Sequence, residues 1–122
     1  MPAKMTFTVF DEVHDRHADG IEYELWRIEK DSKRVNLGHK TFNGSQPLTL
    51  VEANKPEELG SFEIVLYVKE YFDRFNENIK VQDARYVLPF GMNNADETTQ
   101  LRARITPHSF PRPLNRQSPL LS

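Results

Sequence analysis

Cysteine is absent from the 122 residues, so disulfides, thiolate nucleophiles and cysteine-ligated zinc sites are excluded. Charge of one sign is also scarce, because the formal net charge is only −2 at pH 7. Such a chain carries no electrostatic footprint for nucleic acid or for an anionic membrane. Long hydrophobic runs are missing too, including at residues 1–4. We therefore expect no signal peptide, no membrane span and a cytoplasmic location.

The composition that remains is typical of a folded domain. Apolar residues make up 38% of the chain and charged residues 28%, a balance that argues against wholesale disorder. The length suits one domain. We expect a single domain over residues 1–122, with an ordered part from about 5 to 116 and a tail over 117–122.

Alternating polar and apolar residues recur in short segments, as in half-buried strands. This pattern predicts strands over residues 5–10, 21–28, 35–42, 48–51, 61–69, 81–88 and 98–106. Residues 14–20 read as a loop, and residues 70–75 as a short helix. Residues 107–122 contain four prolines and can hold at most an edge strand. Without the alternation of strands and helices that builds a parallel sheet, the fold class is an all-β sandwich with one short helix.

Histidine is the first candidate for proton-transfer chemistry. His14 and His17 lie in an acidic loop whose spacing matches no defined metal-ligand pattern, so a solvated loop is favoured over a metal site. His39 is expected to be exposed on a strand. His108 follows the polar-faced strand 98–106 and is the candidate catalytic imidazole. No cofactor signature is present.

The strand over residues 98–106 has one markedly polar face. Thr98, Gln100, Arg102 and Arg104 share that face, opposite the apolar face that includes Leu101. A solvated outer surface is the simpler explanation of this pattern. The alternative is a cavity wall closed by another subunit, in which the rigid guanidinium fork would suit planar carboxylate-like or imide-like groups.

The order of motifs resembles the family of transthyretins and hydroxyisourate hydrolases, over about residues 5–116. Residues 8–11 (Thr-Val-Phe-Asp) look like the family's H-V-L-D strand, and residues 20–27 are similar to its G-x-x-x-x-L-W-R strand. Residues 41–46 occupy the place of T-N-x-D-G-R. Residues 62–72 resemble the strand that runs into Y-F and a short helix, and residues from 98 onward fall where the family has H-Y-H-V-P-L-L-x-S-P.

This resemblance implies a sandwich of two four-stranded sheets and a homotetramer, a dimer of dimers, whose central channel carries the active sites. In the hydrolases, two histidine positions, an arginine and a C-terminal Y-R-G-S tail form each site. The family hydrolyses a cyclic ureide, with histidine activating water and arginine holding ring oxygens.

The sequence departs from the family at each of those positions. Thr8 stands in the place of the first histidine, Gln46 in that of the arginine, and Thr98 and Gln100 in those of H-Y-H. Residues 113–116 (Pro-Leu-Asn-Arg) replace the Y-R-G-S tail. Threonine and glutamine form hydrogen bonds but do not exchange protons near neutral pH, so water activation at this pair is not expected.

The favoured hypothesis is a diverged protein that binds, and in one version transforms, a small planar polar or anionic ligand in an inter-subunit channel. The ligand contacts would come from Thr6, Thr8, Gln46, Gln100 and Arg104, together with Arg102. The alternative is an enzyme acting on a cyclic amide, lactam or biosynthetic intermediate, with His108 as acid–base group and Arg102 as oxyanion partner. Hydroxyisourate hydrolysis and a non-catalytic carrier are the less favoured hypotheses.

Overall fold

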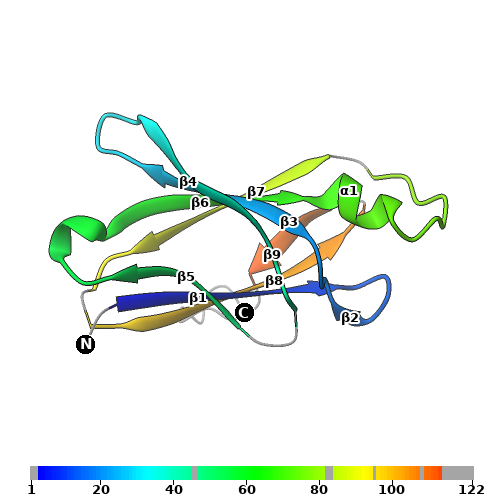
Figure 1. Cartoon of the computed structure of the whole chain (residues 1–122), viewed down its shortest axis with the longest axis horizontal. Helices are drawn as coiled ribbons and strands as arrows, with labels where there is room; N and C mark the ends of the chain where they lie inside the picture. The colour runs from blue at the N-terminus through cyan, green and yellow to red at the C-terminus, as the bar shows by residue number, and fades with distance from the viewer. Residues whose placement is uncertain (1–2, 45–46, 82–83, 95, 108, 114–122) are drawn as a thin grey trace.

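Alternation of buried and exposed side chains organises the strands of the computed structural model. The structure describes residues 3–44, 47–81, 84–94, 96–107 and, for the backbone only, 109–113. Strand β1 (Ala3–Asp11) buries every second residue, and strand β8 (Thr98–Thr106) buries Leu101, Ala103 and Ile105. Each strand therefore has one face in the core and one face outside. Two sheets packed face to face form a sandwich (Figure 1).

The first sheet is built around β1. It pairs in parallel with β8 along one edge, and β8 in turn pairs with β9 (Ser109–Pro113). Along the other edge of β1 lie two short antiparallel partners, β5 (Leu48–Ala53) beside its first half and β2 (Arg16–His17) beside its end. The sheet is thus four strands wide, with β2 and β5 following one another along the same edge.

The second sheet is antiparallel throughout and runs in the order β4, β3, β6, β7. Its strands are β3 (Glu22–Ile28), β4 (Arg34–Thr41), β6 (Gly60–Tyr67) and β7 (Arg85–Met92). The predicted strand over 81–88, ended by Pro89, is wrong in its bounds, because β7 starts at Arg85 and runs through Pro89. β7 has β6 as its single neighbour in the described chain, and an edge strand tolerates a residue that cannot donate to the ladder.

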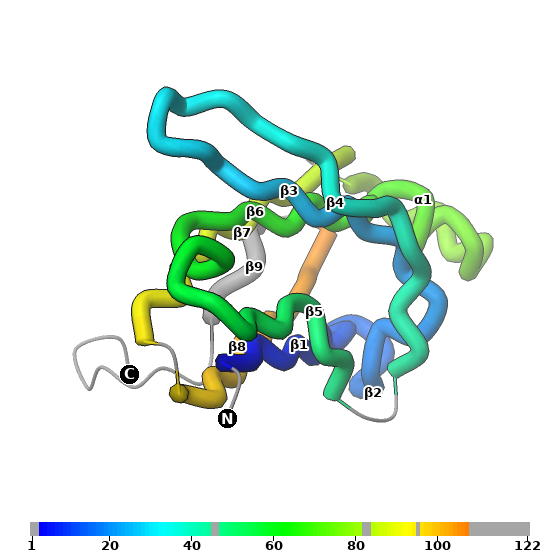
Figure 2. Tube along the Cα trace, turned by 60° about the vertical axis from the view of Figure 1, so that its left-hand side comes forward, coloured from blue at the N-terminus to red at the C-terminus, as the bar shows by residue number. Residues whose placement is uncertain are grey.

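The inner faces of the two sheets form one apolar core. Its largest fully buried side chains are aromatic: Tyr71, Tyr86, Phe7, Phe42, Phe62 and Phe72. Phe7 packs edge-on against Phe42 at a centroid distance of 5.9 Å, which joins β1 to the segment after β4. Figure 2 shows the two layers, with β3, β4, β6 and β7 in one and β1, β2, β5 and β8 in the other. The predicted sandwich of two four-stranded sheets with a short helix is confirmed.

Helix α1 (Val68–Asp73) continues directly from β6, two residues before the predicted helical segment. It buries Val68, Tyr71 and Phe72 and lies at the end of the sandwich where β1 turns into β2 (Figure 1). A 3₁₀ turn, η1 (Pro56–Glu58), precedes β6. Among the described residues, no helix has the length and apolar character required to cross a bilayer.

Candidate functional site

The parallel pairing of β1 with β8 brings the polar faces of both strands together. The register places Thr6 beside Gln100, Thr8 beside Arg102 and Phe10 beside Arg104. The neighbouring residues of both strands point into the core, so these six side chains point outward. The polar face that the sequence predicts on β8 thus continues onto β1, a strand almost a hundred residues away in the sequence.

A depression of about 350 Å³ lies on this outer face. We call it the β1–β8 pocket. Its described lining residues are Thr6, Thr8, Phe10, His17, Pro47, Gln100, Leu101, Arg102, Ala103 and Arg104. The lining thus combines hydroxyl, amide, guanidinium and imidazole groups with one aromatic ring, and none of these described lining residues is acidic.

The two arginines of the pocket are held differently. Arg102 donates from Nη2 to Oε1 of Gln100 at 3.1 Å, a bond to a neutral group, and among the described residues it forms no ion pair. Arg104 donates to a carboxylate oxygen of Glu12 at 3.4 Å, and its guanidinium carbon lies 5.6 Å from the centroid of the Phe10 ring. Arg102 is therefore the cation better placed to receive an anion.

His17 reaches the pocket from β2, the two-residue strand that sequence reasoning assigned to a loop. It pairs in register with Phe10, and its ring stands edge-on to the Phe10 ring at 5.8 Å. The acidic composition of residues 11–19 predicts a solvated loop and gives no indication of this pairing. The signal is geometric: a chain that reverses after Asp11 and pairs along the edge of β1 sets His17 opposite Phe10, with both side chains on the outer face of the sheet.

The segment that follows β4 packs against His17 and Asp19. Gly44 is buried, and a Cβ atom at this position would lie 3.0 Å from Cβ of His17 and 3.2 Å from Cα of Asp19. The Gly44 backbone N–H donates to Oδ1 of Asp19 at 2.8 Å. The absence of a side chain at position 44 thus allows this segment to pack closely against β2.

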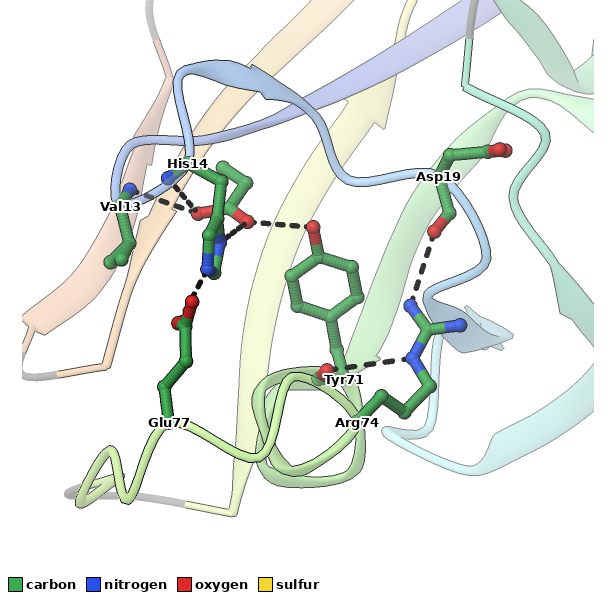
Figure 3. A network of polar contacts seen from close by, with 7 residues as sticks. Val13, His14, Asp19, Tyr71, Arg74 and Glu77 are labelled. Atoms are coloured by element: carbon green, nitrogen blue, oxygen red, sulfur yellow. Dashed lines mark hydrogen bonds and ion pairs between the residues drawn. The ribbon is translucent and has the colours of Figure 1, made fainter.

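A second polar cluster lies on the inner side of the same β1–β2 turn and consists of Asp11, His14, Tyr71 and Glu77. The fully buried Asp11 carboxylate accepts hydrogen bonds from the Tyr71 hydroxyl at 2.7 Å and from the backbone N–H of Val13 at 2.9 Å. It also accepts the His14 backbone N–H at 3.2 Å. Figure 3 shows His14, Tyr71 and Glu77 converging from the turn, from α1 and from the segment after α1.

Both ring nitrogens of His14 contact carboxylates. Nδ1 lies 2.5 Å from Asp11 and Nε2 lies 2.6 Å from Glu77, and the ring stacks on Phe75 at 3.9 Å. An imidazole donates from both nitrogens only when it is protonated. The hydrogen bond with Asp11 accordingly raises the pKa of His14, against the lowering effect of its burial.

Tyr71 completes the cluster from α1. Burial, and then its hydrogen bond to Asp11, raise the pKa of Tyr71. The cluster links α1 to the end of β1, so the His14 imidazole has a structural role. The prediction of a solvated loop is wrong for Asp11 and His14, and the described residues contain no group of three or more His, Cys, Asp or Glu side chains arranged to hold a metal.

The predicted site residues divide into two groups. The pocket brings together Thr6, Thr8, Gln100, Arg102 and Arg104, all five of the predicted residues that the structure describes. Gln46 and His108, by contrast, lie outside the described residues. The ligand-binding role of the first five and the catalytic role of His108 and Arg102 stay predictions.

Sequence comparison finds no matching protein-family model and no significantly similar curated protein. Solved structures do match in three dimensions. An (S)-allantoin synthase is 20% identical with a TM-score of 0.79, and the match covers 93% of this chain. The chain spans only 44% of the length of that synthase.

Two transthyretins are also similar in structure. Transthyretin from Sparus aurata is 11% identical with a TM-score of 0.71, and the match covers 90% of this chain and 95% of the transthyretin. Sea bream transthyretin in complex with thyroxine is 12% identical with a TM-score of 0.73, over 93% and 97% of the two chains. The protein therefore has the transthyretin-like fold, as the motif resemblance implied.

Proposed function

We propose that this chain, a transthyretin-like sandwich, binds a small planar anion in the β1–β8 pocket. The observation that carries the proposal is the composition of the pocket: two guanidinium groups, two hydroxyls and an amide surround about 350 Å³, and no described lining residue is acidic. Although the net charge of the chain is −2, the described lining of this pocket contains only cationic, neutral polar and apolar side chains.

The chemistry of the lining favours a flat ligand with a carboxylate or an ionised imide. Arg102 offers paired N–H donors in one plane, which match two oxygens of such a group. The Thr8 hydroxyl stands beside it on β1, and the Phe10 ring supplies an apolar contact on the next row. Small-molecule sites usually combine a few converging polar groups with aromatic surface in this way.

The structural neighbours support small-molecule binding in general terms, because one of them is a transthyretin in complex with thyroxine. They do not supply a chemistry for this chain. Thr8 and Gln100 line the pocket from the neighbouring strands β1 and β8, and neither side chain exchanges protons near neutral pH. Hydroxyisourate hydrolysis by these two groups is therefore not part of the proposal.

The proposal includes a homotetramer whose copies close the pocket. The β1–β8 face forms one wall of a binding site, and two-fold symmetry would place the same wall opposite it. Facing arginines repel each other unless acidic groups or a bound anion compensate their charge, and Glu12 already pairs with Arg104. Sedimentation velocity tests this assembly: a tetramer is expected, and a monomer at micromolar concentration would remove the channel while leaving an open pocket.

Calorimetry with matched probes tests the binding function. We expect wild-type protein to bind benzoate or barbiturate and to bind benzamide, the neutral analogue of benzoate, much more weakly. Arg102→Ala should lose roughly tenfold to hundredfold in affinity, the equivalent of a charge-assisted hydrogen bond. Arg34→Gln is the matched control, because Arg34 stacks on Trp26 on the other sheet, at 4.5 Å. No binding of any probe, or equal binding by Arg102→Ala, would contradict the proposal.

A further inference from the structure

We infer that His17 is the proton-dependent cation of the β1–β8 pocket: it takes up a proton when an anionic ligand binds and so makes binding stronger at lower pH. This inference rests on the proposed function, since it concerns the same pocket. It adds a second residue, besides Arg102, that favours an anion over a neutral ligand of the same shape.

The position of His17 carries the inference. It lines the pocket together with Arg102 and Arg104. Phe10 on β1 pairs in register with His17 on β2 at one side and with Arg104 on β8 at the other. The Phe10 ring contacts both side chains. An imidazole and a guanidinium group therefore flank one aromatic ring on the outer face.

The backbone on either side of His17 is fixed, so the imidazole belongs to a built surface. The N–H of Ala18 donates to the carbonyl of Val9 at 2.9 Å, and the N–H of Asp19 donates to the carbonyl of His17 at 2.8 Å. Gly44 packs against the His17 Cβ atom from the other side. These contacts hold the start of the side chain, while the ring itself remains exposed toward the pocket.

None of the pocket-lining residues that the structure describes is acidic, so an anionic ligand would supply the negative charge beside His17. From β8 the facing groups are Arg102 and Arg104, and from the turn Glu12 is engaged with Arg104. From the neighbouring segment, Asp19 accepts the Gly44 N–H. Arg16, the preceding residue, stacks over Phe75 at 5.1 Å, near the inner cluster.

Histidine is the side chain suited to this task, because its charge changes between about pH 5 and pH 8. An anion bound beside the imidazole favours the protonated ring, since opposite charges attract. Binding and protonation are then linked reciprocally: the ligand promotes proton uptake, and protons promote ligand binding by the same factor. A neutral ligand gains nothing from this linkage.

Calorimetry in two buffers of different ionisation enthalpy, HEPES and Tris, measures the proton uptake directly. Wild-type protein titrated with benzoate should take up protons near neutral pH. Its affinity should rise roughly fivefold or more between about pH 8 and about pH 5.5, where benzoate itself stays ionised. In His17→Gln both effects should disappear, whereas His39→Gln, which removes an exposed histidine on the other sheet, should keep them.

A second variant keeps the test independent of the folding of the first. His17→Arg places a permanent cation at the same position, so it should bind benzoate with little dependence on pH. Proton uptake that persists in His17→Gln or His17→Arg, or wild-type binding without uptake, would overturn this inference and leave the proposed function standing. Failure of wild-type protein to bind any of the anionic probes would overturn both.

Discussion

Two histidines three residues apart, one in the turn after β1 and one on β2, occupy opposite environments. His14 faces inward, with 16% of its side chain exposed, and both of its ring nitrogens contact carboxylates. His17, three residues later, faces outward into a pocket whose described lining contains arginines and no acid. The fold thus favours the protonated form of the imidazole at one position and leaves the imidazole accessible to a ligand at the other.

The difference arises from the buried carboxylate at the end of β1. Asp11 is fully buried and accepts four hydrogen bonds, which fix the turn and point His14 toward α1. The chain then reverses, and β2 places His17 beside Phe10 on the outer face. The inner cluster therefore determines where the outer imidazole lies. Stability should depend mainly on the inner group and binding mainly on the outer one.

Removal of the Asp11 carboxylate should have the largest effect. Asp11→Ala leaves Tyr71 and His14 without their buried acceptor, and we expect a loss of about 3–5 kcal/mol in the free energy of unfolding. Urea denaturation followed by tryptophan fluorescence measures the change. Asp73→Ala is the matched control: it breaks an exposed ion pair with Lys69, so its effect on the free energy of unfolding should be small beside that of Asp11→Ala. Equal effects of the two variants would contradict the structural role of the inner cluster.

A side chain at position 44 should affect both regions at once. In Gly44→Ala the new Cβ meets the His17 Cβ at 3.0 Å and the Asp19 Cα at 3.2 Å, so the two segments must move apart by a few tenths of an ångström. Such overpacking typically costs about 1–3 kcal/mol. Denaturation and benzoate titration of the same variant should both show a loss. Unchanged stability and affinity would mean that the segment after β4 does not support His17.

The hydroxyl of Thr8 offers a smaller change confined to the outer region. Thr8→Val keeps the shape and the strand preference of the residue, so stability should stay within about 0.5 kcal/mol of wild type. Loss of one hydrogen bond in the pocket should weaken benzoate binding roughly twofold to tenfold. Calorimetry measures the affinity, and an unaltered dissociation constant would place the ligand away from the centre of the pocket.

The smallest expected effect is on the pH dependence of stability, to which His14 should contribute and His17 should not. The pKa of His14 is raised above its ordinary value of 6.5, so the protonated ring stabilises the folded state. This contribution is fully present below about pH 6.5 and is lost as the pH rises through the higher pKa of the folded protein. Wild-type protein should therefore lose more stability than His14→Gln on going from acid to alkaline pH.

His17→Gln serves as the control for that experiment, because it leaves the contacts of His14 intact. Urea denaturation at a series of pH values should give this variant the wild-type dependence. A His14→Gln variant that also follows the wild-type curve would mean that the carboxylates around His14 do not hold its proton.

Local patterns sufficed to predict most of the fold. Period-2 alternation located β8 at its exact bounds and assigned Gln100, Arg102 and Arg104 to its polar face. The same reasoning placed Pro89 at the end of a strand, although β7 continues through it. Alternation describes one strand at a time, and whether a proline is tolerated depends on the position of that strand in the sheet.

The inner cluster, which the sequence does not predict, depends on distant pairs. Asp11 is 60 positions from Tyr71, and His14 is 63 positions from Glu77. No local pattern connects these residues, so the sequence predicts a solvated loop where the structure has a partly buried cluster. A strand of two residues has no detectable periodicity, so the sequence does not predict the position of His17. Its place in the pocket follows only from its pairing with Phe10.

Chemical-shift mapping tests the central claim most directly. Titration of labelled protein with benzoate, followed by amide and side-chain NMR signals, should shift Thr8, Gln100, Arg102 and His17 together in a saturable manner. The signals of His14 and Tyr71 should stay nearly unchanged. Shifts confined to the other sheet or to the inner cluster, or the absence of saturable shifts, would contradict the assignment of ligand binding to the outer face of β1 and β8.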